Sequence, residues 1–254
     1  MAQLQLGARS APNAELPYVV LNMVSTVDGR ATVGGRSGPI SDSPDRALFH
    51  ALREAVDGVL VGAGTVRAER YGRIVPDAER RARRRARGLS EEPLACIVSG
   101  RLDLDGGLPL LADPHAHVAI LTPSQASLPP TGAQVEYVRA ERAGRLDLGA
   151  ALAELRRRFA IRTLLCEGGP HLIYELLAEG LAGELFLTLS PLLAGDEPSG
   201  ASALRILAGG EFDPPAELEL LGVLAGGSSL FLRYGAPAAA RVSRETIESS
   251  SLAR

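Results

Sequence analysis

Two glycine-rich junctions in this sequence combine residue types that suit the binding of an anion. In the stretch LLCEGGPHL, an apolar run ends at Glu167, Gly168, Gly169 and Pro170, and a helical pattern follows. The first N–H groups of such a helix are unpaired, and the positive end of its dipole is exposed. Glycine lets a ligand approach the backbone, and proline suits the first helical position. The junction has the layout of a phosphate site, although a tight turn with a solvated glutamate fits the same residues.

The second junction is VLVGAGTV, in which Gly62, Gly64 and Thr65 separate a buried strand pattern from a short helical stretch. It resembles a dinucleotide fingerprint, but the G-x-G-x-x-G pattern needs glycine at position 67, where Arg67 stands. A standard Rossmann site is therefore not expected. A bland turn explains one such motif. Two glycine turns in one open α/β sheet can face a single crevice.

Two carboxylates accompany these turns. Glu167 would repel a phosphate, so we expect it to point toward a hydroxyl or amine of a bound ligand. Asp28 comes directly before Gly29 at the end of a buried apolar run. Asp-Gly is a strong turn signal, so a plain hairpin turn is one explanation. The other is that Asp28 binds or protonates a polar heterocycle at the mouth of the crevice.

The elements that must position these residues alternate between strand and helix, and the chain ends in strands. This order predicts an α/β fold: a mostly parallel central sheet, helices on both faces and a C-terminal antiparallel hairpin. We expect one domain over 16–235, with an N-terminal extension at 1–15 and a C-terminal tail at 236–254. Strands are expected at 16–25, 57–62, 93–99, 117–122, 133–138, 162–168 and 183–193, helices at 42–55, 146–159 and 171–181, and a hairpin at 216–234.

Composition narrows the function classes. The 254 residues are 46% apolar and carry a net charge of −3, which gives no reason to expect nucleic acid or an anionic membrane as a partner. All 27 basic residues are arginine, which excludes a Walker A loop and a Schiff-base lysine. Cys96 and Cys166 lie in apolar runs and are expected to be buried free thiols in a reducing compartment. No apolar run is long enough to cross a bilayer, so we expect a cytoplasmic protein.

Four motifs, VSTVDGRAT, SGPIS, LREAVDGVLVGAGTV and LLCEGGPHL, resemble those of the riboflavin-biosynthesis pyrimidine reductases in order and approximate spacing. The resemblance covers roughly 16–234 and implies the dihydrofolate reductase-like fold of that family. It is closest to the stand-alone reductases. The deaminase domain of the bifunctional enzymes would need His-x-Glu and Pro-Cys-x-x-Cys, and the sequence has neither.

The resemblance implies that NADPH reduces the ribosyl group of an aminopyrimidine ribosylamine 5′-phosphate to ribityl, in a homodimer. The substrate would be either 5-amino-6-(5-phosphoribosylamino)uracil or its diaminopyrimidine counterpart. Asp28 and Glu167 would be the catalytic residues, with roles that the sequence does not separate. The positions that match cofactor-binding residues are Gly62, Gly64, Thr65, Val66, Ser99, Gly168, Gly169 and Pro170, and those that match substrate-binding residues are Asn22, Ser25, Ser37 and Ser41.

One segment departs from the family. After Gly-Thr-Val many members carry Asp-Asp-Pro-x-Leu, whereas this chain has RAERYGRIVPD at 67–77. The change leaves the substrate open, and Arg67, Arg70 and Arg73 can form a different phosphate clamp. Arg101 is the candidate for recognising the 2′-phosphate of NADPH. Two other functions stay open: reduction of a dihydropterin on the same fold, and a catalytically silent nucleotide-binding module.

Three further stretches invite a functional interpretation. The basic segment AERRARRRARG, at 78–88, is expected to be a solvated helix face or a link over the surface rather than a nucleic-acid site. The stretch HAH, at 115–117, is expected to be a loop leading into the strand at 117–122 rather than a metal site, because no acidic or cysteine cluster completes one. His171 follows the second glycine turn and either contacts a cofactor phosphate or only begins a helix.

Overall fold

The first apolar run of the chain forms the centre of a nine-stranded sheet in the computed structural model, which describes residues 14–196 and 203–236. Strand β1 (Tyr18–Thr26) lies between β8 (Thr163–Cys166) and β9 (Glu184–Ser190) and is parallel to both. It is apolar on both sides up to Leu21 because helices cover both faces of the sheet there.

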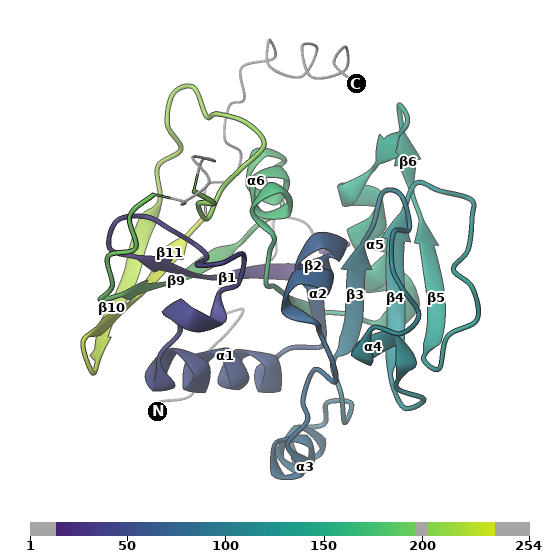
Figure 1. Ribbon diagram of the computed structural model, residues 1–254. Helices are drawn as coiled ribbons and strands as arrows, with labels where there is room; N and C mark the ends of the chain where they lie inside the picture. Colours follow the sequence, from purple (N-terminus) through teal and green to yellow (C-terminus); the bar gives the residue numbers. More distant parts are fainter. Residues whose placement is uncertain (1–13, 197–202, 237–254) are drawn as a thin grey trace.

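The strands on the two sides of this centre differ in direction relative to β1. Beyond β8 the remaining strands run parallel, whereas beyond β9 a C-terminal hairpin pairs antiparallel, which confirms the expected α/β fold (Figure 1). The parallel strands are β2 (Gly58–Gly62), β3 (Leu94–Val98), β4 (His117–Thr122) and β5 (Gln134–Arg139), and the hairpin strands are β10 (Glu219–Gly226) and β11 (Ser229–Gly235).

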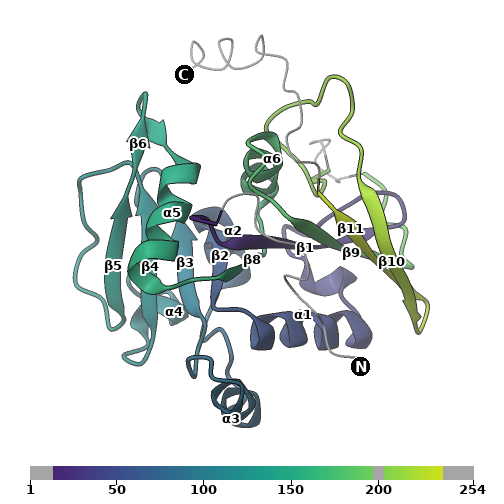
Figure 2. The same cartoon turned by 180° about the vertical axis from the view of Figure 1, so that it is seen from behind.

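Helices pack on both faces, as the alternating pattern requires. One face carries α1 (Ser43–Ala55), α2 (Ala63–Glu69) and the short α4 (Pro109–Ala112), and the other carries α5 (Leu148–Phe159) and α6 (Pro170–Ala178) (Figures 1 and 2). Each face buries its own apolar core: Leu52 and Leu110 belong to the first, and Leu152 and Ile173 to the second. Alternate residues of each strand supply the two cores.

Helix starts follow the expected signals. The Asp42 side chain caps α1 by accepting a hydrogen bond from the Asp45 N–H, and Pro170 is the first residue of α6. Helix α5 begins at Leu148 rather than at 146, because the preceding residues form a small hairpin, β6 (Glu141–Arg142) and β7 (Arg145–Leu146), that the sequence analysis did not anticipate.

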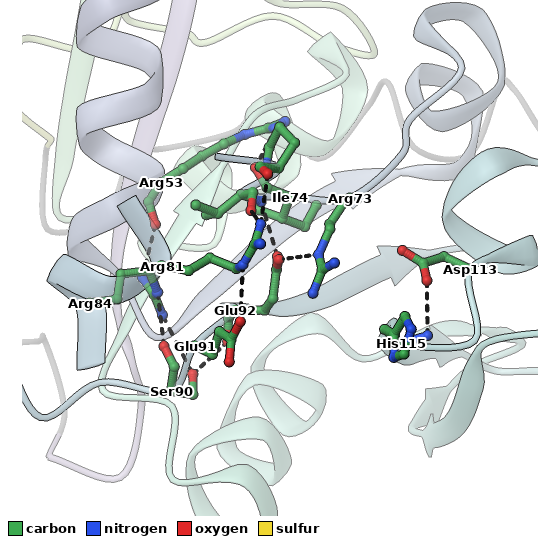
Figure 3. A network of polar contacts seen from close by, with 12 residues as sticks. Arg53, Arg73, Ile74, Arg81, Arg84, Ser90, Glu91, Glu92, Asp113 and His115 are labelled. Carbon is green, nitrogen blue, oxygen red and sulfur yellow. Dashed lines mark hydrogen bonds and ion pairs between the residues drawn. The ribbon is translucent and has the colours of Figure 1, made fainter. Parts of the chain in front are cut away.

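Helix α3 (Ala78–Ala86) is mostly exposed, as expected of a solvated basic face, but one of its arginines departs from that expectation. Arg84 is fully buried and donates hydrogen bonds to the carbonyl oxygens of Arg53, Glu54 and Val56, where α1 ends. Figure 3 shows the bond to the Arg53 carbonyl. The last carbonyl groups of a helix lack hydrogen-bond donors within the helix, and the Arg84 guanidinium supplies those donors here. Arg80, Arg83 and Arg87 pair with the Glu54 carboxylate. The basic helix therefore clamps the end of α1.

The structure also bears on the cysteines, on metal binding and on membrane-spanning helices. Cys96 and Cys166 are buried free thiols, as expected, and burial raises the pKa of Cys166 to about 12. Within 14–196 and 203–236 no group of three His, Cys, Asp or Glu side chains is placed to hold a metal ion. In the same ranges no helix has the length and apolar character needed to span a membrane.

Candidate functional site

A cavity of about 720 Å³ opens at the carboxyl ends of the central strands. Its volume falls in the range of small-molecule sites. The two glycine turns meet there, because the Gly62 N–H donates a 2.7 Å hydrogen bond to the Gly168 carbonyl. Nine of the predicted site residues line the cavity: Asn22, Ser37, Ser41, Gly62, Gly64, Thr65, Glu167, Gly169 and Pro170.

Close packing explains the glycine at position 169, because a Cβ atom there would lie 3.0 Å from Thr65 Oγ1. The two turns lie side by side, since a Cβ atom on Gly62 would be at an ordinary contact distance, 3.4 Å, from the Gly169 nitrogen. Gly168 has a φ of +93°, which favours glycine, and the Gly168–Gly169 peptide is cis. The two turns thus present bare backbone to the cavity beside the first turn of α6. This cradle suits an anionic group of a ligand.

The Glu167 carboxylate is buried in the cavity wall and does not stand free. Arg53 of α1 donates to both of its oxygens, with Nε–Oε1 and Nη2–Oε2 distances of 2.7 Å. The Tyr71 hydroxyl donates to Oε2 at 2.6 Å. Burial and the neighbouring carboxylate raise the pKa of Tyr71, so the phenol stays protonated. Burial opposes the charge on Arg53, yet its pair with Glu167 raises the pKa of the guanidinium.

A loop from β1 to α1 forms another wall of the cavity. Ala31, Thr32, Gly35, Ser37, Gly38 and Ser41 all line it. Glu69, at the end of α2, accepts hydrogen bonds from the Ser37 backbone N–H and hydroxyl. Ser41 donates to the Asp45 carboxylate at 2.5 Å. The second half of the loop is therefore fixed at Ser37 and at Ser41 by carboxylates that belong to helices.

Asn22 leaves a buried polar atom for a ligand. Its side chain lines the cavity, and its Oδ1 atom has no hydrogen-bond partner among the described residues. A buried acceptor without a partner costs free energy, and a donor on a bound molecule removes that cost.

Asp28 lies outside the cavity lining. It follows β1 in an exposed turn, where Gly29 has a φ of +91°. Its Oδ1 accepts from the Thr26 hydroxyl at 2.5 Å, and its Oδ2 accepts from the backbone N–H groups of Ala194 and Gly195 at 2.9 and 2.7 Å. The Thr26 hydroxyl and the Gly195 N–H lower the pKa of the Asp28 carboxyl. In this structure Asp28 joins the turn after β1 to the segment after β9.

Four other predicted residues also lie outside the cavity lining. Ser25 donates to the Thr26 carbonyl, Val66 is buried in the core, and the Ser99 N–H donates to the Leu121 carbonyl. Gly168 belongs to the second turn without lining the cavity itself.

The three arginines of the divergent segment do not form one clamp. Arg67 pairs with Asp103 at 3.3 Å and Arg73 pairs with Glu92 at 2.5 Å, and neither lines the cavity. Arg70, which ends α2 in a left-handed conformation, is the one that does. The segment therefore contributes a single arginine to the cavity.

Sequence reasoning missed Arg53, Tyr71 and Phe49, which line the cavity together. The Arg53 guanidinium lies 4.1 Å from the centre of the Phe49 ring. Phe49 and Arg53 are four residues apart in a helical pattern, so they share a helix face. That spacing was the available signal, and it was interpreted only as helix.

Solved structures and curated relatives resemble this chain over most of its length. A pyrimidine reductase-like protein from Corynebacterium diphtheriae superposes with a TM-score of 0.70 at 23% identity, covering 87% of this chain and 92% of that one. The 2,5-diamino-6-ribosylamino-4(3H)-pyrimidinone 5′-phosphate reductase of Methanothermobacter thermautotrophicus is 29% identical over 225 residues, 86% of this chain and 97% of the relative. The Archaeoglobus fulgidus protein of the same name is 29% identical over 185 residues, 72% and 84% of the two chains.

The parallel sheet with its C-terminal hairpin and the cavity at its strand ends define a protein of the pyrimidine reductase-like fold. Residues 17–232 match the RibD C-terminal domain family. The chain belongs to that family, which confirms the resemblance to the riboflavin-biosynthesis pyrimidine reductases.

Proposed function

We propose that this protein reduces the ribosyl group of 2,5-diamino-6-ribosylamino-4(3H)-pyrimidinone 5′-phosphate, or of its deaminated counterpart, to ribityl with NADPH. The observation that carries the proposal is the single cavity in which two glycine turns meet a polar wall of Asn22, Arg53 and Glu167. The names of the relatives and the family match support the reaction class.

The residues present fit a nicotinamide cofactor. Gly62, Gly64, Thr65, Gly169 and Pro170 would surround its phosphates, and backbone N–H groups such as those of Gly64, Thr65 and Gly169 would donate hydrogen bonds to them. The orphaned Asn22 Oδ1 would accept a hydrogen bond from an amino or amide group of a ligand. When bound, NADPH supplies the hydride.

The chain's own residues bind, orient and shield the reactants. Ser37 and Ser41, on the loop between β1 and α1, would contact the substrate and keep water out. Glu167 would accept a hydrogen bond from it as a fixed carboxylate. Asp28 would act from outside the cavity, by holding the turn after β1 in place. Holding the reacting groups in position is the main catalytic contribution that this arrangement offers.

Oxidation of NADPH, followed at its absorbance band with three candidate substrates, tests the proposal. We expect turnover with the diaminopyrimidinone or aminouracil ribosylamine phosphate and none with dihydrofolate. Turnover with dihydrofolate alone would favour the pterin alternative, and NADPH binding without any turnover would favour the silent module. Parallel titrations with NADH test the cofactor preference, and comparable affinities would remove it.

We also propose that residues 16–235 form a single reductase domain and that the protein is cytoplasmic. Two copies of this domain would form a homodimer through the edge hairpin of β10 and β11. Leu220, Val223, Leu224 and Leu230 are 55%, 50%, 73% and 43% exposed, and β10 is the outermost strand of the sheet among the described residues. Such an apolar edge favours pairing with another chain. Light scattering should give twice the chain mass for the wild type and the single mass for Leu224→Glu.

A further inference from the structure

The hydrogen bonds to Glu167 account for most of what its carboxylate can accept. Oxygen Oε2 accepts from Arg53 Nη2 and from the Tyr71 hydroxyl, whereas Oε1 accepts only from Arg53 Nε. A carboxylate has about four acceptor positions, two on each oxygen. One position on Oε1 is therefore open among the described residues, and Glu167 lines the cavity.

The clamp on Glu167 is itself held in place. Arg53 Nη1 donates to the Ile74 carbonyl at 3.0 Å, and Phe49 stacks against the guanidinium. The Arg53 carbonyl accepts from Arg84 of α3 at 3.0 Å (Figure 3). The side chains of Arg53 and Glu167 are 9% and 2% exposed. A pair so packed does not rotate away to release the carboxylate.

The pair of Arg53 and Glu167 lies next to the expected binding site for the cofactor phosphates, so its net charge affects their binding. Glu167 directly precedes the Gly168–Gly169 turn, where Gly169 lines the cavity and its backbone suits an anion. A bare carboxylate next to that turn would repel a phosphate, most strongly where water is excluded. The bidentate guanidinium cancels the negative charge at the point where an anionic ligand must approach.

A second triad of glutamate, arginine and tyrosine lies away from the cavity. Glu184 is fully buried and accepts from Arg233 Nε at 2.7 Å, Arg233 Nη2 at 2.9 Å and the Tyr18 hydroxyl at 2.7 Å. It joins β1, β9 and β11, and none of its three residues lines the cavity. Both triads bind a glutamate through an arginine and a tyrosine, but only the first lines the cavity. Variants of the second triad therefore report the effect of losing such a pair on stability alone, without an effect on a ligand.

We propose that Arg53 is a positioning residue with two tasks at the active site. It fixes Glu167 so that one acceptor position on Oε1 faces the substrate, and it cancels the carboxylate charge so that the cofactor phosphates can occupy the adjacent turn. The inference rests on the proposed function.

Three variants at this pair separate charge from geometry. Arg53→Lys keeps the charge but loses the bidentate geometry. Arg53→Met removes both, and Arg53→Met/Glu167→Gln removes the pair together. The matched controls are Arg233→Met and Arg233→Met/Glu184→Gln. For each protein, NADPH affinity is titrated by fluorescence at low and high salt, unfolding is followed in urea, and kcat and KM are measured for the diaminopyrimidinone substrate.

Arg53→Met should weaken NADPH binding about tenfold at low salt, and most of that loss should persist at high salt, because salt screens a buried charge only weakly. The double variant should regain that affinity while its kcat stays about 100-fold low, because the oriented acceptor is lost. Arg53→Lys should keep NADPH affinity within about threefold and lose about tenfold in kcat. Both Arg233 variants should lose stability and keep wild-type NADPH affinity per folded molecule.

Several results would overturn the inference. One is wild-type affinity and turnover in folded Arg53→Met; another is an equal loss of affinity in Arg233→Met. Failure of the double variant to regain NADPH affinity would remove the charge cancellation. Should Arg53→Met not fold, wild-type kcat in Arg53→Lys would refute the positioning role. A wild type that binds no NADPH overturns the proposed function and this inference together, whereas the other results leave the proposed function standing.

Discussion

Glu69 accepts hydrogen bonds from both donors of Ser37: its Oε1 atom lies 2.7 Å from the Ser37 backbone nitrogen and 2.9 Å from the Ser37 hydroxyl. Arg36 Nε lies 3.5 Å from the other carboxylate oxygen. Glu69 ends α2, whereas Ser37 belongs to the loop between β1 and α1. A single side chain thus ties the loop along the cavity to the helix that follows the first glycine turn.

Glu69→Ala should loosen this loop without unfolding the protein. Hydrogen bonds to a charged group contribute about 1.5–3 kcal/mol each, so amides of the loop should exchange with solvent at least about tenfold faster. The KM for the pyrimidine substrate should rise. Hydrogen-exchange mass spectrometry over residues 31–41 measures the first effect. Glu79→Ala, at a side chain that is 90% exposed, is the control and should change neither quantity.

Gly169→Val should weaken NADPH binding by at least about tenfold while the protein stays folded, because its side chain would block the approach of a phosphate. The added Cβ would also lie 3.0 Å from Thr65 Oγ1 and push the two turns apart. Fluorescence titration gives the affinity. In the control, Gly149→Ala on α5, the nearest atom lies 3.6 Å from the new Cβ. Normal affinity in folded Gly169→Val would reduce the second glycine turn to a structural turn.

Asp28→Asn should flatten the acid side of the stability curve. The pKa of Asp28 lies below its ordinary value of 3.8, chiefly because of the Thr26 hydroxyl. Such a group adds stability that is fully present above 3.8 and is lost as the pH falls through the lower folded value. As the pH falls below 3.8, the wild type should therefore lose more stability than the variant. Urea unfolding at several pH values measures the difference.

The same variant tests the catalytic assignment. Because Asp28 lies outside the cavity lining, Asp28→Asn should keep NADPH affinity and turnover within a few-fold of the wild type. A lost acid–base residue typically costs about 10²–10⁴-fold in rate. If a thermal melt shows that the variant is folded and its turnover falls by that factor, Asp28 is a catalytic residue.

Arg84→Met should destabilise the protein by about 3 kcal/mol, because three carbonyl oxygens at the end of α1 lose a charged donor in a buried site. Arg85→Met on the same helix is the control, since its side chain is 55% exposed and pairs only with the half-exposed Glu91. Exposed pairs contribute about 0–1 kcal/mol. Equal stabilities of the two variants in urea would show that the cap on α1 contributes little.

The sequence was sufficient for features with local causes. Strand β4 was predicted with its observed bounds, because a parallel strand covered on both faces is a continuous apolar run. The Asp42 cap and the first position of Pro170 were also predictable, since each depends only on the next few residues. The two glycine turns face one cavity because the parallel strands that precede them end at the same edge of the sheet.

The contacts that define the site wall have distant causes. The pair of Arg53 and Glu167 joins residues 114 apart, and its geometry depends on how α1 lies across the sheet. Asp28 was assigned to the cavity from its place after β1, but its backbone partners lie 166 and 167 residues further along the chain. Arg84 was interpreted as solvated because nothing in its own helix indicates that α1 ends against it.

The central place of β1 imposes an order on synthesis. Its two neighbours, β8 and β9, are translated more than 130 residues after it, so the first apolar strand leaves the ribosome without either hydrogen-bonding partner. Strand β2 meets a shorter delay on one side, because it pairs with β3 soon after it and with β8 only much later. Pairings so remote along the chain make folding slow and leave apolar strands exposed meanwhile. The nascent chain should therefore depend on chaperones until α6 and β9 have emerged, and a ribosome stalled before Thr163 should carry a chain that proteases digest readily.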